Sequence, residues 1–155
     1  MKRTLFLVLV GSLALASCNR TKAPDVSGTT MTKAFASQLD TAAGYSDDAG
    51  SAAYVDLTGG DRRTTLTATG LKASTAYIAH YHARGTGAAV TATTTDCASG
   101  GSVVGGLIGG ASATSDATGK LTIRGFQATA DLSTAAYINI HEAATPSVIP
   151  LCADI

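Results

Sequence analysis

The stretch TAYIAHYHAR at residues 75–84 and the stretch AYINIH at residues 136–141 decide the expected fold. Both are short and rich in aromatic and β-branched residues, which are enriched in β-strands. In the second stretch Tyr137, Asn139 and His141 alternate with isoleucine, which is the period-two pattern of a strand. We therefore expect both stretches, Thr75–Arg84 and Ala136–His141, to be β-strands.

Five further segments have the same composition and lie between turn signals such as Gly59-Gly60 and Gly109-Gly110. They are Thr30–Leu39, Ala52–Leu57, Arg63–Thr69, Ser102–Ile108 and Lys120–Ala128. No ten-residue stretch has convincing helical periodicity. Seven or eight strands at this spacing predict an all-β fold, a Greek-key β-sandwich or barrel of about eight antiparallel strands.

Composition limits the class of protein. The chain has 155 residues, which fits one domain, and 45% of them are hydrophobic, which excludes a charge-rich disordered chain. Its 11 basic and 11 acidic residues give no net charge, so the chain has no field to hold phosphates. We therefore expect no nucleic-acid partner.

The N-terminus has the pattern of an export signal. Lys2 and Arg3 precede the mostly apolar stretch Thr4–Ala16, which is too short to cross a bilayer as a helix. The sequence LASC at residues 15–18 resembles the bacterial lipobox, which implies cleavage before Cys18 and lipid attachment to it. An ordinary secretory signal with a chance cysteine is the alternative.

These features predict three parts of the chain: a signal peptide (1–17), a lipidated tether (18–28) and a β-domain (29–155). Several acyl chains on Cys18 would anchor the protein stably to a membrane. We expect an exported protein, lipid-anchored to a bacterial membrane in the cell envelope, either periplasmic or at the outer surface.

The three cysteines fit the same interpretation. If Cys18 is acylated, Cys97 and Cys152 remain, and two thiols in an oxidising compartment are expected to pair. Thiolate ligation of a metal is the alternative for this pair.

All three histidines of the chain lie in the two strands quoted first. His80 and His82 share one face of their strand, at a spacing of about 6.5 Å, and His141 ends the other strand. A pair at i, i+2 with a third histidine from a neighbouring strand predicts a three-imidazole metal site. Imidazole suits copper, zinc and nickel, and divalent copper binds most tightly. Three unrelated surface histidines are the alternative.

The order of these residues resembles copper/zinc superoxide dismutase. The matching features are the His80-x-His82 pair preceded by Gly70-Leu71, then Cys97, then His141-Glu142, then Cys152. The resemblance implies a dismutase-like fold, catalytic copper ligands at His80, His82 and His141, and a Cys97–Cys152 disulfide. Two segments also resemble chordin-type (CHRD) domains, namely 79–82 and 137–141.

The chain also departs from the dismutase pattern. It has no histidine between Ala83 and Ile140, so zinc is not expected and the copper site should hold one ion per chain. Ile149 occupies the position of the substrate-guiding arginine, and Arg84 or Arg124 could substitute for it. Without a bridging histidine, Glu142 or bound water would have to supply protons, so we expect slower or less pH-tolerant turnover.

The sequence thus predicts a copper-dependent, dismutase-like envelope lipoprotein that acts on superoxide. The principal alternative is a non-catalytic chordin-type module that binds copper or has a structural role in an envelope protein assembly. A three-histidine zinc hydrolase or hydratase is a further alternative.

Overall fold

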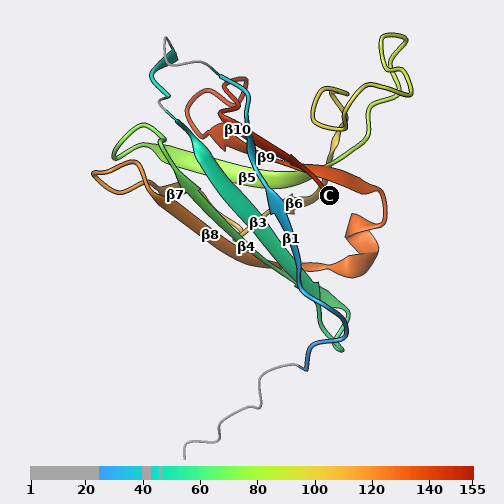
Figure 1. Cartoon of the computed structure of the whole chain (residues 1–155). Helices are drawn as coiled ribbons and strands as arrows, with labels where there is room; N and C mark the ends of the chain where they lie inside the picture. The colour runs from blue at the N-terminus through green and yellow to red at the C-terminus, as the bar shows by residue number, and fades with distance from the viewer. Residues whose placement is uncertain (1–24, 40–42, 46) are drawn as a thin grey trace, which may run out of the picture.

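Two antiparallel β-sheets lie face to face in the computed structural model, which describes residues 25–39, 43–45 and 47–155 (Figure 1). The predicted signal peptide, Cys18 and most of the tether lie outside the described residues. Within the described ranges, no helix is long and apolar enough to span a bilayer.

One sheet has four strands. In spatial order they are β1 (Met31–Ala34), β3 (Ala49–Asp56), β4 (Asp61–Thr69) and β8 (Leu121–Ala128).

The other sheet has six strands. In spatial order they are β2 (Ala36–Ser37), β10 (Leu151–Asp154), β9 (Ala135–Glu142), β5 (Ala76–Ala83) and β6 (Val103–Leu107), with β7 (Ala113–Thr114) also paired to β5. The short 3₁₀ helix η2 (Thr129–Leu132) connects β8 to β9.

The connections between the sheets are of the Greek-key type. After β4 the chain crosses to the other sheet, forms β5 and β6 there, and returns in β8 beside β4. It then crosses again to form β9 beside β5. A fourth strand that returns beside the first defines a Greek key. The prediction of an all-β Greek-key fold is confirmed, and the two separate sheets make it a sandwich rather than a closed barrel.

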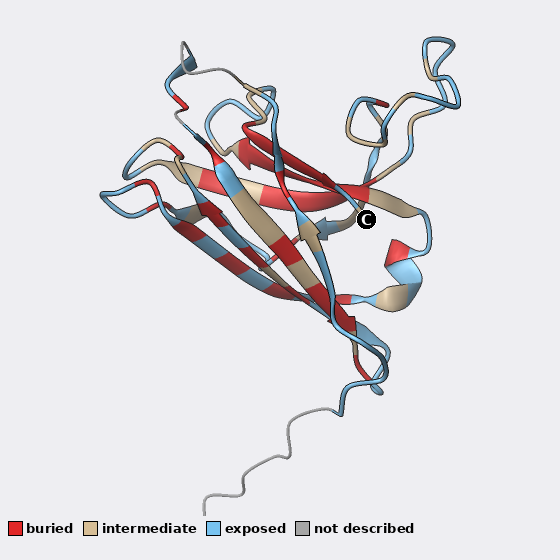
Figure 2. Ribbon diagram, viewed as in Figure 1, coloured by how far each residue is buried: buried red, intermediate tan, exposed pale blue. Residues whose placement is uncertain are grey.

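The core lies between the sheets and follows the alternation of the strands. In β8, Leu121 and Ile123 are buried whereas Arg124 is exposed. The central strands β5 and β9 differ, because they are buried on both faces (Figure 2). Their core-facing residues, such as Tyr81 and Ile140, belong to the main hydrophobic cluster. The opposite face of these two strands carries the histidines and must therefore be covered by other parts of the chain.

The predicted strand Thr30–Leu39 is split by the tertiary structure. Phe35 is buried in the core, and its N–H donates to the carbonyl of Gly50. The residues before it form β1 in one sheet, and those after it form β2 in the other. A continuous strand pattern could not predict this change of sheet. The short strand β10, which follows Pro150, was also missed by the pattern.

The two sheets are joined by a buried hydrogen bond between Thr64 Oγ1 and Tyr81 OH, at 2.7 Å. Changing Tyr81 to Phe should lower the free energy of unfolding by about 1–3 kcal/mol, because the threonine hydroxyl loses this partner while staying buried. Adding Thr64→Val should recover most of the loss. Denaturant unfolding of both single variants and the double variant measures this, and additive losses would contradict the coupling.

Candidate metal centre

The register between β5 and β9 places the histidines on one face. Residues paired across antiparallel strands share a face. Three pairs define this face: Ile78 with His141, His80 with Asn139, and His82 with Tyr137. It is the outer face of the six-stranded sheet, because the alternate residues of both strands lie in the core.

This outer face is nevertheless buried. The exposed fractions are 8% for His80, 7% for His82 and 5% for His141. Two connecting segments contact the rings, one through the carbonyl of Gly101 and the other through the carbonyl of Pro146. The segment between β5 and β6 and the segment between β9 and β10 therefore cover the histidines.

These carbonyls determine which nitrogen of each ring carries its proton. His82 Nδ1 lies 2.9 Å from the Gly101 oxygen, and His141 Nδ1 lies 2.5 Å from the Pro146 oxygen. A carbonyl oxygen only accepts, so each Nδ1 must donate, and each neutral ring keeps its lone pair on Nε2. Such carbonyl contacts are the usual way in which metal-binding histidines are oriented.

The ring nitrogens that no carbonyl holds converge, and in the protein without an ion His80 Nδ1 donates to His82 Nε2. His80 Nδ1 and His82 Nε2 are 2.9 Å apart, and one ligand atom from each of the three histidines lies within 4.8 Å of the others. Two metal–imidazole bonds of about 2.0–2.1 Å that meet at about 90° span about 2.9 Å. His141 Nε2 is buried without a hydrogen-bond partner, and a bound cation would satisfy it. The prediction that these histidines form a group able to hold a metal ion is confirmed.

Burial keeps the three imidazoles neutral. It lowers the pKa of His80 to about 4, chiefly by desolvation, with repulsion from the other two histidines adding to the effect. Burial also lowers the pKa of His82 and of His141. All three rings therefore offer lone pairs at neutral pH, as metal binding requires.

Tyr137 braces His82 from the neighbouring strand. The two rings are stacked, with centroids 4.7 Å apart and planes at 10°. The tyrosine hydroxyl also donates to the carbonyl of Gly101, at 3.3 Å. A Cβ on Gly101 would lie 1.7 Å from the carbonyl oxygen of Ala83, so only glycine allows this close approach. In the sequence Gly100-Gly101 was only a turn signal, and nothing there indicated that the Gly101 carbonyl accepts hydrogen bonds from His82 and Tyr137.

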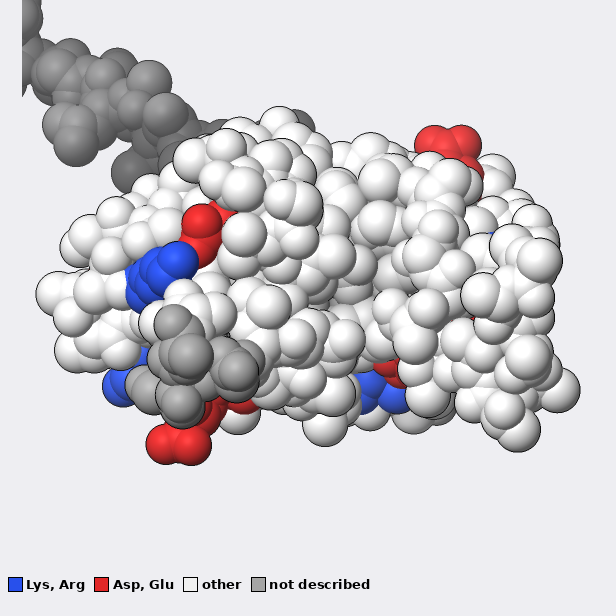
Figure 3. Space-filling view, turned by 90° about the horizontal axis from the view of Figure 1, so that it is seen from above, with Lys and Arg blue, Asp and Glu red and all other residues white. Residues whose placement is uncertain are grey.

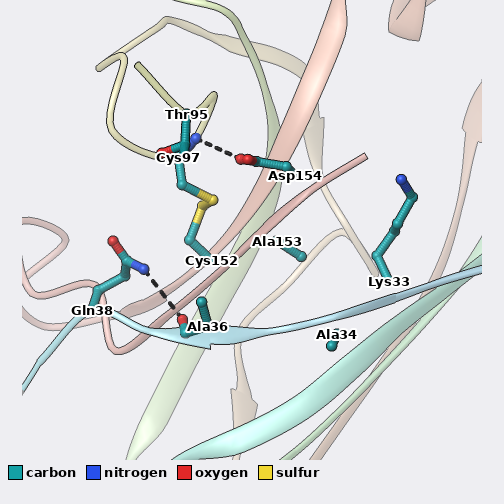
Figure 4. A pocket seen from close by; sticks show the side chains of 9 residues that line it. All are labelled: Lys33, Ala34, Ala36, Gln38, Thr95, Cys97, Cys152, Ala153 and Asp154. Carbon is teal, nitrogen blue, oxygen red and sulfur yellow. Dashed lines mark hydrogen bonds between the residues drawn. A yellow bond between two sulfur atoms is a disulfide. The ribbon is translucent and has the colours of Figure 1, made fainter. Parts of the chain in front are cut away.

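The predicted disulfide is present between Cys97 and Cys152, with a Cα–Cα distance of 5.9 Å (Figure 4). Cys152 pairs with Asn139, which in turn pairs with His80, so the bridge lies on the histidine face. The N–H of Cys97 donates to Asp154 at 2.7 Å. The bridge therefore holds the β5–β6 segment over this face, and it excludes the alternative of two thiolate metal ligands.

Arg84 belongs to the covering segment rather than to a free surface. Its guanidinium pairs with the carboxylate of Asp96 and donates to the carbonyls of Thr91 at 3.0 Å and Thr94 at 2.7 Å. These three contacts organise the β5–β6 segment. The expected role of Arg84 in guiding substrate therefore competes with a structural one.

Arg124 and Glu142 are not brought to the histidines. Arg124 is exposed in β8 of the other sheet, on the face away from the core. Glu142 follows His141 directly, so it points to the opposite side of β9. There its carboxylate accepts hydrogen bonds from Lys72 Nζ, at 2.7 Å, and from the hydroxyl of Tyr45. The predicted roles in substrate guidance and proton supply do not fit these positions.

Comparison with known proteins identifies no family for this chain. No family model matches the chain, and no curated protein matches it either.

The stability of the metal-free protein should depend on pH through these histidines. Their folded-state pKa values lie below the unfolded value, so the unfolded chain binds protons first as the pH falls. Stability should be unaffected above about pH 6.5 and should fall between there and about pH 4, the folded-state pKa of His80. Thermal unfolding against pH measures this. His80→Gln should flatten the profile, and an unchanged profile would contradict the assignment.

The disulfide should contribute substantially to stability. Its two cysteines are 55 residues apart, and closing a loop of that size is worth roughly 4 kcal/mol in the chain-entropy model. Cys97→Ser combined with Cys152→Ser should lower the free energy of unfolding by about this amount. Chemically reduced wild type is the matched control. Equal stability of the oxidised and reduced wild type would contradict the prediction.

Proposed function

We propose that this protein binds one copper ion through His80, His82 and His141 and disproportionates superoxide. The observation that carries the proposal is the convergence of three nitrogens, two of them on rings whose protons are held by carbonyls. Among divalent first-row metals, copper binds such sites most tightly. The two-sheet antiparallel sandwich is also an architecture that copper/zinc superoxide dismutase shares.

A second metal is not part of the proposal. The chain has three histidines, and all of them are in the one group. Among the described residues, one further group of candidate ligands lies close enough together, namely Cys97, Cys152 and Asp154. Both of its sulfur atoms are in the disulfide. We therefore propose a mononuclear site without zinc.

The reaction converts two superoxide anions and two protons into one dioxygen and one hydrogen peroxide. Bound copper would take an electron from one superoxide as Cu(II) and return it to the next as Cu(I). The protein's part is to hold three neutral rings in place, with the Gly101 and Pro146 carbonyls keeping their orientation. Because Glu142 is held on the other side of β9, the protons come from water.

Electrostatic attraction of the superoxide anion to the proposed copper site should be weak. Figure 3, which shows the molecule from above relative to Figure 1, has a largely uncharged surface with small groups of charged side chains. In the two described segments that cover the histidines, Arg84 is the one cationic residue, and its guanidinium is paired with Asp96 rather than free to attract an anion. We therefore expect a rate below the diffusion limit, with little dependence on ionic strength.

The proposal places the protein at a bacterial membrane. The lipobox-like sequence at residues 15–18 supports lipidation of Cys18, and the disulfide is typical of oxidising, exported compartments. The fold begins with a bridge between Val26 and Leu57. Residues 19–25 can span at most about 25 Å, so the domain would stay close to the membrane surface.

A second function is copper binding without turnover, in a chordin-type or structural envelope module. One observation favours it: no proposed substrate-guiding or proton-supplying residue is free at the histidines. Arg84 is paired with Asp96, Arg124 lies in the other sheet, and Glu142 is bound to Lys72 on the other side of β9. Under this proposal the buried site sequesters copper, and its partners are envelope proteins.

Metal analysis and activity together test the proposal. The mature chain from residue 18 should retain about one copper ion with an imidazole-type electron paramagnetic resonance (EPR) spectrum, and should consume superoxide only when loaded. Replacing any of the three histidines by Gln should weaken copper binding by about 100-fold or more, since even outer contacts are worth 10–100-fold. Arg124→Gln, in the other sheet, is the matched control and should change neither property.

The outcomes separate the functions. Copper without superoxide consumption selects the sequestering module. One tightly held zinc ion in place of copper would indicate a hydrolase or hydratase. Absence of bound metal overturns all of these functions.

A further inference from the structure

Two unpartnered polar atoms lie close together on the histidine face. Among the described residues, four buried side-chain atoms lack a hydrogen-bond partner: Asp48 Oδ2, Gln127 Oε1, Asn139 Oδ1 and His141 Nε2. The last two belong to side chains on the same face of β9, one strand repeat apart. A buried amide oxygen without a partner costs about 1–3 kcal/mol, so this pair calls for an explanation.

Asn139 lies at the centre of the histidine face. Across one side of β9 it pairs with His80, and across the other with Cys152. On its own strand it lies between Tyr137 and His141. Directly opposed side chains have their Cβ atoms about 4.5–5.5 Å apart. Because asparagine is shorter than histidine, its amide lies nearer the sheet than the rings do.

The histidine rings beside Asn139 contact each other. The centroids of His80 and His141, its cross-strand and same-strand neighbours, are 4.5 Å apart. Asn139 itself is 4% exposed, and it also lines a small surface pocket with Cys97 and Ser147. A valine or threonine would fit a strand better than asparagine. The polar residue therefore needs a partner that the described protein atoms do not provide.

The unpaired atoms share one chemical property. His141 Nε2 and Asn139 Oδ1 are both lone-pair acceptors, and so is the Nε2 of His82, whose proton is on Nδ1. His80 Nδ1 donates to His82 Nε2 at 2.9 Å and leaves the other two acceptors without a partner. A cation in place of that donated proton would satisfy all three acceptors. One ion held by the three histidines would also be the missing partner of the amide oxygen.

We propose that the side-chain oxygen of Asn139 is a fourth contact of the metal, from the sheet side of the three-histidine group. This inference rests on the proposed copper site and adds a residue to it. Amide oxygen is known as a weak axial ligand that tunes copper sites. A hard oxygen favours Cu(II) over Cu(I), so Asn139 should lower the reduction potential of the bound ion.

The test compares Asn139→Val with the wild type in the copper-loaded mature chain. The variant should bind Cu(I) as the wild type does but Cu(II) about tenfold more weakly, which raises the one-electron potential by about 59 mV. Its Cu(II) EPR spectrum should change. Its metal-free form should melt at a higher temperature than the metal-free wild type, because the orphaned oxygen is gone, and copper should stabilise it less.

Two further variants serve as controls. Gln127→Leu removes another buried amide with an unpartnered oxygen, on β8 in the other sheet, and should leave the EPR spectrum and the potential unchanged. Asn139→Asp keeps an oxygen at the same place and adds charge. It should restore the tight Cu(II) binding that valine loses and lower the potential below that of the wild type.

The experiment distinguishes failure of the Asn139 inference from failure of the copper site itself. Identical spectra and potentials for the wild type and Asn139→Val, with copper bound in both, overturn the role of Asn139 and leave the three-histidine site intact. A wild type that binds no copper overturns the copper site and this inference together.

Discussion

The register between β5 and β9 is the constraint on which the site depends. It sets His141 opposite Ile78 and Asn139 opposite His80, so that all the candidate ligands share the outer face of the sheet. A slip of one residue would move His141 into the core and Ile140 out of it. The core residues of both strands oppose such a slip, because Tyr81, Ile138 and Ile140 are almost completely buried. Core packing thus determines the geometry of a site on the opposite face.

The second requirement is a cover for that face. The outer face of a sheet is normally exposed to solvent, and imidazoles exposed there would titrate near pH 6.5. Here the segment held by the disulfide and the segment before β10 bury the rings, and their carbonyls accept the Nδ1 protons of His82 and His141. Burial under these segments lowers the pKa values, whereas the two carbonyl hydrogen bonds orient the lone pairs and act in the opposite direction on the pKa of His82 and of His141. Gly101 is essential to this arrangement, since no side chain fits beside Ala83.

Predictions from the pattern succeeded where a local rule decides the outcome. The alternation of Tyr137, Asn139 and His141 with isoleucine is a property of the backbone period, and the structure has these faces. The predicted roles of Arg124 and Glu142 do not fit their positions, because neither residue type nor place in the chain says which face or sheet a side chain lies on. Glu142 is adjacent to His141 and for that reason points away from it. The split at Phe35 has a similar cause, since a change of sheet leaves the strand pattern unaltered.

By itself the sequence determined the strand-rich fold class, the face shared by His80 and His82, and the pair of cysteines left to form a bridge. These follow from residue type and from the two-residue period, which act within a few residues of the chain. Only the tertiary structure decided that β9 lies beside β5, that carbonyls of the covering segments hold the Nδ1 protons of His82 and His141, and that Asn139 Oδ1 lies unpartnered on the histidine face. These features depend on pairing between strands that are far apart in the chain and on the segments that cover them, and they exist only once the sheets have packed.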